Sequence, residues 1–268
     1  MQLAAAPLPS SYPVHPDRVP PGVFLDGAYA LRFGRCDEDL DAVQRLRFEV
    51  FSEEAGERDF EEEGRDADPF DPTFHHLLVF ERRSGRLVGT YRLQTAEMAS
   101  TAIGFYSATE LDLSPLPAEI LAQGVETGRA CVAREHRNGR VLRALWRGIA
   151  TYLRHNDKRY LFGCCSLPTT EAEVALRTWA SLLSDGAFHP SLRAIPRVPL
   201  LAEVPAPGAP VPYPPLLKGY LSLGARVCSA PVLDADFGTI DFFIVLDVHD
   251  VEPRVVARLS DSSLWSAQ

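Results

Sequence analysis

A polar turn at residues 134–140 leads into a segment whose apolar residues recur at helical spacing from Val141 onward. The Asn138-Gly139 pair in the turn is a strong local breaker, so a helix is predicted to begin just after it. Backbone N–H groups at a helix N-terminus have no partner within the helix, and the helix dipole is positive there. This combination suits a phosphate group, and we predict that the turn can bind one.

The predicted helix carries arginines on the face opposite its apolar residues: Arg140, Arg143, Arg147 and Arg154. From Arg129 to Arg159, nine basic against two acidic side chains give a local charge of +7, whereas the whole chain carries −9. A solvated helix face and a docking surface for a partner with phosphate or acidic helices both fit this pattern. The acidic balance of the whole chain argues against general nucleic-acid binding.

The apolar segment 125–133 before the turn contains Glu126, Gly128 and Arg129. It has the length of a strand, and 160–167 after the helix has the composition of a second buried strand. A strand, helix and strand of these lengths form a right-handed crossover, so we expect the two strands to lie parallel in one sheet. Because strict alternation would put Glu126 and Arg129 on opposite faces, their pairing requires a bulge, which we place at Gly128.

Two arginines stand among predicted buried positions. Arg47 lies on the apolar side of a predicted helix over 37–54, either as a snorkelling side chain or as a charge directed into a site. Arg92 lies on one face of a predicted strand over 86–94. A buried arginine needs a carboxylate partner, and the candidates for Arg92 are Asp68, Asp71 and Glu126.

Metal binding is not expected. His75-His76 lie on the other strand of the predicted hairpin, 74–81, where neighbouring side chains point to opposite faces. The five cysteines are odd in number and lack the spacing of metal-ligand pairs. Reduced thiols in the cytoplasm fit this usage best.

The remaining organisation predicts a mixed α/β fold. Residues 1–27 are rich in proline and small residues and should form an arm, and 260–268 should form a frayed tail. Between them, 28–259 reads as one domain with a surface insertion at 188–216, where nine of the 22 prolines fall. No apolar run approaches the roughly 18 residues of a membrane span, and the N-terminus does not resemble a signal peptide.

Several stretches resemble one known family, the ornithine-lipid N-acyltransferases, which are also described as hemolysin-like acyltransferases. They include LRFEVFSEEAG (46–56), ADPFDPTFHHLLV (67–79), VGTYRL (88–93), ETGRACV (126–132), HRNGRVLRALWRGIA (136–150) and LFGCCSLPTT (161–170). A seventh stretch is PPLLKGYLSLGARVCSAPVLDADFGTIDFF (214–243), and the resemblance spans about residues 28–259. It implies a mixed sheet flanked by helices, as in Gcn5-related N-acetyltransferases.

The resemblance also implies a reaction. A 3-hydroxyacyl chain carried on acyl carrier protein, or an acyl-CoA thioester, serves as co-substrate, and no cofactor stays bound. The acceptor is the α-amine of ornithine and the product is a lyso-ornithine lipid. Enzyme and carrier protein would meet in the cytoplasm. Because the product is amphiphilic, the 188–216 insertion is expected to make peripheral contact with the inner face of the membrane.

Site residues follow from the similarity to the family and to acyl-homoserine-lactone synthases. The charged cluster of those synthases matches Asp68, Asp71, Arg92, Glu126 and Arg129, and Arg47 is added as a residue near the substrate. Glu126 is the expected base for the amine, and backbone N–H groups near Gly128 are expected to hold the oxyanion. The phosphopantetheine of the donor is assigned to Val132, Arg137, Asn138, Gly139 and Arg140. His136 and Val141 depart from the usual acetyl-CoA loop, which favours a single phosphate over a CoA pyrophosphate.

Two alternatives remain open from the sequence. The enzyme could acylate another amine, such as glycine or a homoserine derivative, or use a short acyl-CoA donor. A non-catalytic acyl-binding module of the same fold is the other alternative. Acyl-donor preference and the effect of Glu126→Ala distinguish these interpretations.

Overall fold

The computed structural model describes residues 12–55, 64–200, 211–259 and 265–266, and the account below concerns these residues. Their packing defines two units, and each is described by itself. The first comprises Met1–Gly104, Thr127–Lys158 and Pro253–Gln268, and the second comprises Phe105–Glu126 and Arg159–Glu252. The expected single domain over 28–259 therefore stays a prediction.

The first unit is built on a mostly antiparallel sheet. Its strands, in sheet order, are β12 (Trp265–Ser266), β1 (Val23–Asp26), β2 (Tyr29–Phe33), β3 (His75–Glu81), β4 (Leu87–Thr95) and the second part of β6 (Gly124–Val132). Strands β12 to β4 pair antiparallel in this order. The β3–β4 hairpin confirms the two strands predicted around the turn at 82–85.

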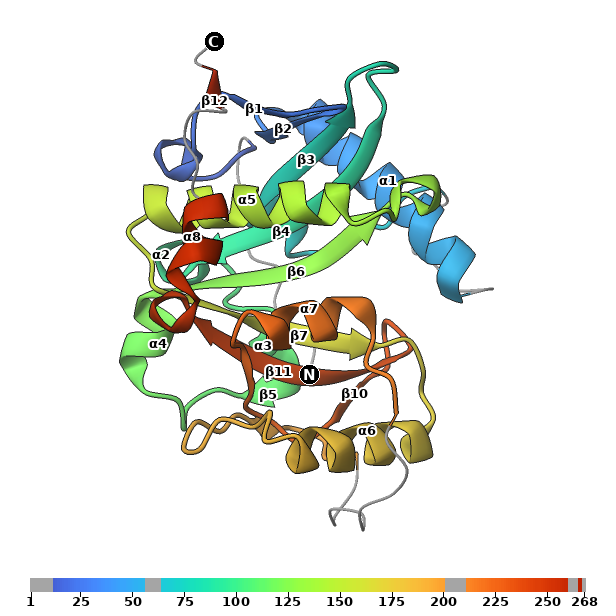
Figure 1. Ribbon diagram of the computed structural model, residues 1–268, viewed down its shortest axis with the longest axis vertical. Helices are drawn as coiled ribbons and strands as arrows, with labels where there is room; N and C mark the ends of the chain where they lie inside the picture. The colour runs from blue at the N-terminus through green and yellow to red at the C-terminus, as the bar shows by residue number, and fades with distance from the viewer. Residues whose placement is uncertain (1–11, 56–63, 201–210, 260–264, 267–268) are drawn as a thin grey trace. The chain divides into compact units, whose positions relative to one another are not determined.

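Helices cover this sheet. They are α1 (Asp37–Ala55), α2 (Ala96–Ser100) and α5 (Arg140–His155), and α8 (Pro253–Leu259) packs against α5. Helix α5 packs against β2, β3 and β4, whereas α1 packs against β3 and β4 (Figure 1). Gly148 permits the close approach of α5, because a Cβ there would lie 2.6 Å from Leu77 Cδ2 and 2.9 Å from Leu31 Cδ2.

The second unit contains the parallel pair that the sequence predicted. The first part of β6 pairs parallel with β7 (Tyr160–Leu167), with Glu126 opposite Phe162. The strands that extend this sheet beyond β7 are β11 (Thr239–Asp247), β10 (Val232–Asp234) and β9 (Arg226–Val227), all antiparallel. A separate two-stranded sheet joins β5 (Leu111–Asp112) to β8 (Ile195–Pro196).

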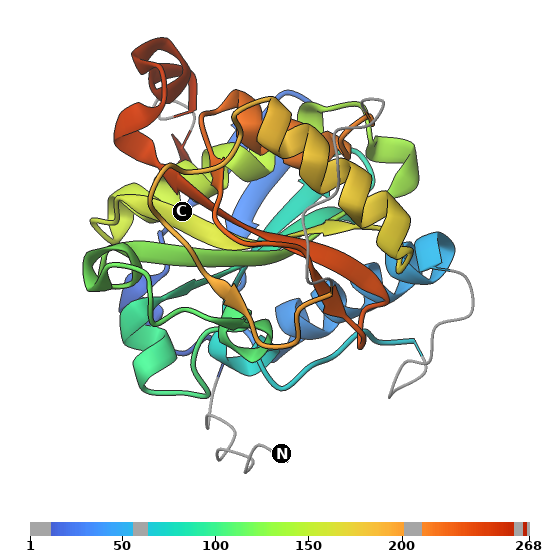
Figure 2. The same ribbon diagram turned by 90° about the horizontal axis from the view of Figure 1, so that it is seen from below.

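Helices α6 (Ala172–Ser184) and α7 (Pro215–Ser222) lie on one side of β7 and β11 (Figure 2). The segment with α3 (Ser107–Glu110) and α4 (Ala118–Ala122) contributes to a core with β7 and β11. The main buried residues of this core are Leu111, Leu113, Leu116, Ile120, Tyr160, Phe162, Phe243 and Val245. Alternation on β7 places Cys164 on the same face as Phe162.

Two paired strands lie outside the predicted domain of 28–259. Strand β1 lies inside the predicted arm 1–27, and β12 lies inside the predicted tail 260–268 and pairs with β1. Helix α8 was not predicted at all. Residues 1–11, 56–63, 201–210, 260–264 and 267–268 lie outside the described residues, and so do the parts of the predicted arm, insertion and tail that fall there.

Short 3₁₀ helices complete the secondary structure, at Pro16–Arg18, Asp71–Thr73, Arg134–His136 and Val248–Asp250. Within the described ranges, every helix is too short or too polar to cross a lipid bilayer.

Candidate active site

A cluster of ion pairs joins α1 to β4 in the first unit. Arg47 Nη1 donates to Asp71 Oδ1 over 2.8 Å, Arg47 Nη2 donates to Oδ2, and Arg92 Nη1 reaches Oδ1 at 3.1 Å. Burial opposes the ionisation of Asp71, but Arg47, His76 and Arg92 outweigh burial and hold its pKa well below the ordinary value. Asp71 is therefore a carboxylate at neutral pH.

Two further aspartates complete the cluster. Arg92 also donates to Asp68, and Arg47 Nε lies 2.9 Å from Asp66 Oδ2. Asp68 and Asp71 are thus confirmed as partners of Arg92. The Arg47 side chain has 0% exposure, so snorkelling is excluded and its charge points into the protein. Asp66 was not assigned a role from the sequence.

Arg129 interrupts the regular course of β6. Its φ of 55° lies in the left-handed region, which is uncommon for a residue with a Cβ. The sequence placed the break at Gly128, and the left-handed residue is one position later. The Arg129 guanidinium donates to Asp66 and lies over the Phe51 ring, with Cζ 5.0 Å from the centroid. Burial, reinforced by Arg47, lowers the pKa of Arg129 to about 10, so it stays charged at neutral pH.

Burial decides what this cluster can touch. The side chains of Arg47 and Asp71 are 0% exposed and that of Arg92 is 1% exposed, whereas that of Asp68 is 14% exposed. A substrate could thus reach Asp68 without rearrangement, while the other three hold α1, β4 and Asp68 in place.

The two neighbouring histidines of β3 point to opposite faces, as the alternation predicted. His75 Nδ1 lies 2.7 Å from the Tyr152 hydroxyl of α5. His76 instead faces the ion-pair cluster, with Nε2 3.6 Å from Asp71 Oδ1 and Nδ1 3.0 Å from the Tyr12 hydroxyl. The segment around Tyr12 is therefore tied to the cluster.

In the second unit, the start of α3 fixes Glu126. Its Oε2 accepts the Tyr106 N–H at 2.8 Å, and its Oε1 accepts the Ser107 N–H at 2.7 Å and the Ser107 hydroxyl at 2.5 Å. Glu126 is 2% exposed. These three donors hold the Glu126 carboxyl group in one orientation.

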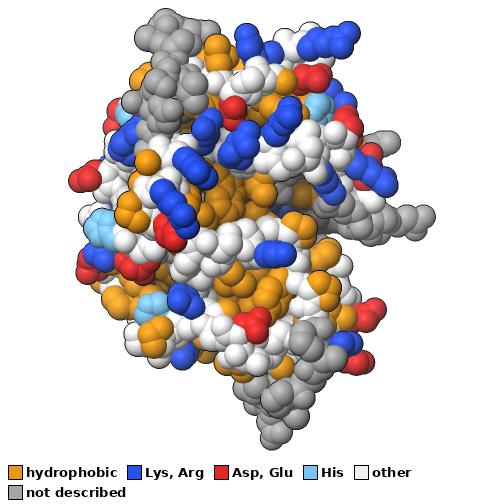
Figure 3. Space-filling model, viewed as in Figure 1, with side chains coloured by type: hydrophobic (Ala, Val, Ile, Leu, Met, Phe, Trp, Pro, Cys, Tyr) orange, Lys and Arg blue, Asp and Glu red, His pale blue; other side chains and the backbone are white. Residues whose placement is uncertain are grey.

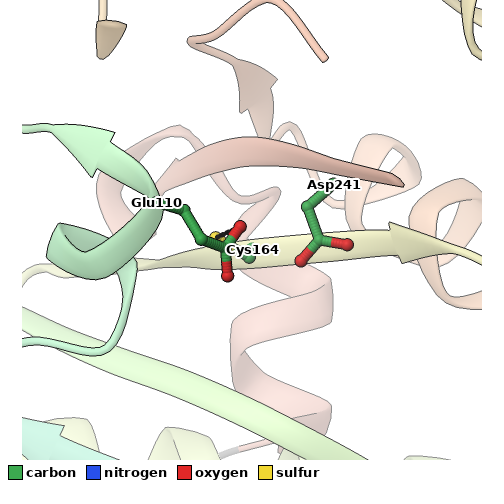
Figure 4. Close-up of side chains that lie close together, drawn as sticks. All are labelled: Glu110, Cys164 and Asp241. Atoms are coloured by element: carbon green, nitrogen blue, oxygen red, sulfur yellow. Dashed lines mark hydrogen bonds between the residues drawn. The ribbon is translucent and has the colours of Figure 1, made fainter. Parts of the chain in front are cut away.

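A second group of acids lies on the same sheet face. The donor atoms of Glu110, Cys164 and Asp241 all lie within 4.8 Å of one another, and the three side chains converge from α3, β7 and β11 (Figure 4). Burial and the charge of Glu110 raise the pKa of Cys164 well above its ordinary value.

The predicted phosphate-binding turn is exposed. Gly139 caps α5 with a φ of 79°, and Asn138 Oδ1 accepts the Arg140 N–H at 3.0 Å. Arg137 Nε donates to the Val132 carbonyl at 3.0 Å. Lys and Arg side chains gather over α5 (Figure 3), although Arg147 is partly engaged by Asp26 at 3.2 Å.

Comparison with known proteins decides the family. A family model described as an acetyltransferase (GNAT) domain matches residues 46–147. An L-ornithine N(alpha)-acyltransferase from Brucella abortus (strain 2308) is 35% identical over 249 residues, which cover 86% of this chain and 88% of that protein. A protein of the same description from Agrobacterium fabrum is 32% identical, over 86% of this chain and 85% of the relative. The chain belongs to the L-ornithine Nα-acyltransferase family. It is an N-acyltransferase, as the sequence resemblance predicted.

Solved structures show the same fold. The CoA-dependent acyl-homoserine lactone synthase BjaI superposes with a TM-score of 0.52 at 16% identity, over 86% of this chain and 87% of that chain. The acyl-homoserine lactone synthase LasI gives a TM-score of 0.50 at 14% identity, over 90% and 98%. The predicted α/β fold of the Gcn5-related N-acetyltransferase type is thereby confirmed.

Proposed function

We propose that this N-acyltransferase moves a long 3-hydroxyacyl chain from acyl carrier protein to the α-amine of ornithine, giving a lyso-ornithine lipid. The observation that carries the proposal is the shared description of the relatives. Four proteins at 32–35% identity, over 83–86% of this chain, are each described as L-ornithine N(alpha)-acyltransferase.

Amide formation from a thioester requires a neutral amine. Glu126 takes a proton from the α-ammonium, directly or through a water, and the freed lone pair forms the N–C bond as the C–S bond breaks. The nitrogen loses a second proton as it becomes an amide, and the departing thiolate takes up this proton and leaves as the pantetheine thiol. The proton first taken by Glu126 is thus the one that the whole reaction releases. Backbone N–H groups at the break in β6, at Gly128 and Arg129, are assigned to the developing oxyanion. The left-handed backbone of Arg129 supports this assignment, since such strain tends to persist at functional sites.

A covalent acyl-enzyme is not part of the proposal. Nucleophilic attack by cysteine needs the thiolate, and burial raises the pKa of both Cys164 and Cys165. Direct attack by the amine needs no such group.

In the first unit, we assign Asp68 to the ammonium groups of the amino-acid substrate. Asp71, Arg92 and Arg47 are assigned to the same substrate-binding region, where they fix Asp68. This division rests on the exposure of the four side chains, because Asp68 alone among them has more than 1% of its side chain exposed.

The donor is assigned to the opening of α5. The exposed turn residues Arg137, Asn138, Gly139 and Arg140 would bind the phosphopantetheine phosphate, with Val132 beside the pantetheine arm. The exposed arginines of α5 match the acidic helices of a carrier protein. We favour a carrier-protein donor over CoA because of the departures at His136 and Val141.

The product would enter the inner face of the cytoplasmic membrane. Within the 188–216 insertion, Ile195 and Val198 are 52% and 72% exposed, and the exposed Arg197 lies between them. Apolar side chains beside arginine suit an anionic bilayer surface. Membrane association that high salt reverses is expected, and recovery of all the protein in the soluble fraction at low salt would count against this contact.

A thiol-release assay tests the function. Purified enzyme would receive 3-hydroxypalmitoyl carrier protein, or the matching acyl-CoA, with ornithine, lysine, glycine or no amine. The proposal expects thiol release that depends on ornithine and the carrier protein and is lost in Glu126→Ala. Faster thiol release with acyl-CoA would show that CoA, and not the carrier protein, carries the acyl chain. Release that depends on glycine and not on ornithine would show that glycine is the acceptor.

A further inference from the structure

One face of the second unit's sheet gathers carboxyl groups that the proposed reaction has not yet used. Asp241 on β11 lies opposite Ser166 on β7 and Val232 on β10, so it shares a face with Cys164 and Asp234. Helix α3 covers this face and adds Glu110. The Tyr106 hydroxyl, just before α3, donates to Asp234 Oδ2 at 2.6 Å.

These carboxyl groups lack basic partners. Within the described part of the chain, Glu110, Asp234 and Asp241 form no ion pair with a lysine or arginine. Arg197 lies beside α3, but its Nε donates to the Ala108 carbonyl. Asp241 is 2% exposed, and Glu110 Oε1 is enclosed without a hydrogen-bond donor. Buried carboxylates this close repel one another and cannot all be ionised, so the group holds at least one proton near neutral pH.

The titration of the group agrees with this geometry. Burial, followed by the charges of Asp241 and Asp234, raises the pKa of Glu110 to about 9. Burial and the charge of Asp234 raise the pKa of Asp241 to about 7. Cys164 faces the group from β7, Tyr106 from the start of α3 and Glu126 from β6, and each of them is an acid that adds no positive charge. Asp241 therefore changes its protonation where an enzyme of the cytoplasm works.

A chain of polar atoms connects the group to Glu126. The Ser107 hydroxyl donates to Glu126 Oε1 at 2.5 Å, and Cys164 Sγ lies 3.7 Å from Ser107 Oγ. The same sulfur lies 3.7 Å from Glu110 Oε2. Glu126, Ser107, Cys164 and Glu110 thus follow one another in an enclosed sequence of groups that can each hold or pass a proton.

We propose that Glu110 and Asp241 store the proton that leaves the amine substrate, with Ser107 and Cys164 linking them to Glu126. The inference rests on the proposed function, in which Glu126 first takes that proton. Glu126 passes it to Ser107 Oγ, Ser107 gives its own hydroxyl proton to Cys164 Sγ, and Cys164 gives its thiol proton to Glu110 Oε2. Glu110 already carries a proton, so it releases that proton to the neighbouring Asp241 carboxylate as it takes up the new one. Each transfer breaks one O–H or S–H bond and forms another, and Glu126 is returned to the ionised form for the next turnover.

The experiment begins with the enzyme alone. Protein labelled with ¹³C in its side-chain carboxyls would be titrated by NMR as wild type, Asp241→Asn and the control Asp247→Asn. Asp247 lies on the same strand but pairs with Arg159, outside the group. We expect one carboxyl that titrates at about pH 7 in wild type and in the control and that is missing in Asp241→Asn. Titration of all carboxyls below about pH 5 would overturn the proposal, since no proton would then be stored.

Enzyme kinetics then tests whether proton storage by Glu110 and Asp241 takes part in turnover. In wild type, kcat with ornithine should fall as the pH drops through the same value, because a protonated pair cannot accept another proton. Asp241→Asn should lower kcat about tenfold and leave KM for ornithine within about twofold, since general base catalysis supplies roughly 10²–10⁴ in rate. Cys164→Ala should lower kcat in the same way, and Cys164→Ser, which keeps a donor, should restore most of it.

The contrary outcomes are distinct. A tenfold rise in KM for ornithine with unchanged kcat in Asp241→Asn would mean that the acids bind the second ammonium of the substrate instead. Unchanged kinetics in Asp241→Asn, with active wild type, would overturn the proton store and leave the proposed function intact. Absence of ornithine turnover in wild type would overturn the proposed function itself, while the NMR titration would still report on the acid pair.

Discussion

Replacing Asp71 by asparagine tests whether the ion-pair cluster holds the first unit together. The substitution keeps the size and shape of the side chain and removes the charge that Arg47 and Arg92 share. Both guanidinium groups then stay buried, with less negative charge beside them to offset the cost of removing their positive charges from water. Breaking a buried pair by removing one partner lowers stability by about 3–5 kcal/mol. Because the asparagine oxygen still accepts one hydrogen bond, we expect a loss of about 3 kcal/mol at pH 7.

The measurement is the free energy of unfolding from urea titrations, with Asp41→Asn as matched control. Asp41 pairs with Arg45 and Arg65 at the surface, where each of the three side chains is at least 33% exposed, so its loss should change stability by about 1 kcal/mol or less. The folded pKa of Asp71 is depressed, so its contribution is present above its ordinary value of 3.8 and is lost as the pH falls below it. The difference in stability between the two variants should therefore be full at pH 7 and smaller by roughly 1 kcal/mol at pH 3, less than one unit below 3.8. A loss below about 1 kcal/mol in Asp71→Asn at pH 7 would refute the reasoning.

Three other predictions concern packing, protonation and docking. Gly124→Ala should lower stability by at least about 1–3 kcal/mol in thermal or urea unfolding, because its Cβ would lie 2.4 Å from the Ile120 carbonyl oxygen; near-neutral behaviour would contradict that close contact. Burial lowers the pKa of His75 from 6.5 to about 4, so stability should be lost as the pH falls through this window, by up to about 3 kcal/mol. His75→Gln should remove this dependence of the free energy of unfolding on pH. If the dependence is unchanged in the variant, groups other than His75 cause it. Arg140→Glu should reduce kcat/KM for the carrier-protein donor about tenfold at low salt and far less at high salt; equal loss with an acyl-pantetheine donor would place the effect outside carrier docking.

The sequence predicted best where one local pattern determines the structure. The crossover unit of β6, α5 and β7 follows from apolar spacing and the Asn138-Gly139 breaker, and Tyr160–Leu167 is a strand over the predicted residues. The β3–β4 hairpin and α1 follow from the same kind of signal. Strand β12 was missed because two residues form a strand only when a distant partner, β1, is already in place.

The candidate site divides in the same way. The pairing of Arg92 with Asp68 and Asp71 was predicted because a buried arginine requires a nearby carboxylate. Asp66 was missed because it belongs to an acidic run whose members look equivalent until the chain folds. The sequence did contain one indication of the cluster formed by Glu110, Cys164 and Asp241, because Asp241 is an ionisable residue inside the apolar strand 239–247. Glu110 gave none, because α3 is too short to show a helical period.

The central claim is that this enzyme acylates the α-amine of ornithine. The most direct test incubates the purified enzyme with 3-hydroxypalmitoyl carrier protein and ornithine labelled with ¹⁵N at the α position only. The account predicts a lipid product whose amide nitrogen carries the label, as read by fragmentation in mass spectrometry, and no such product from Glu126→Ala. An unlabelled amide nitrogen, or no lipid product from a folded enzyme, would contradict it.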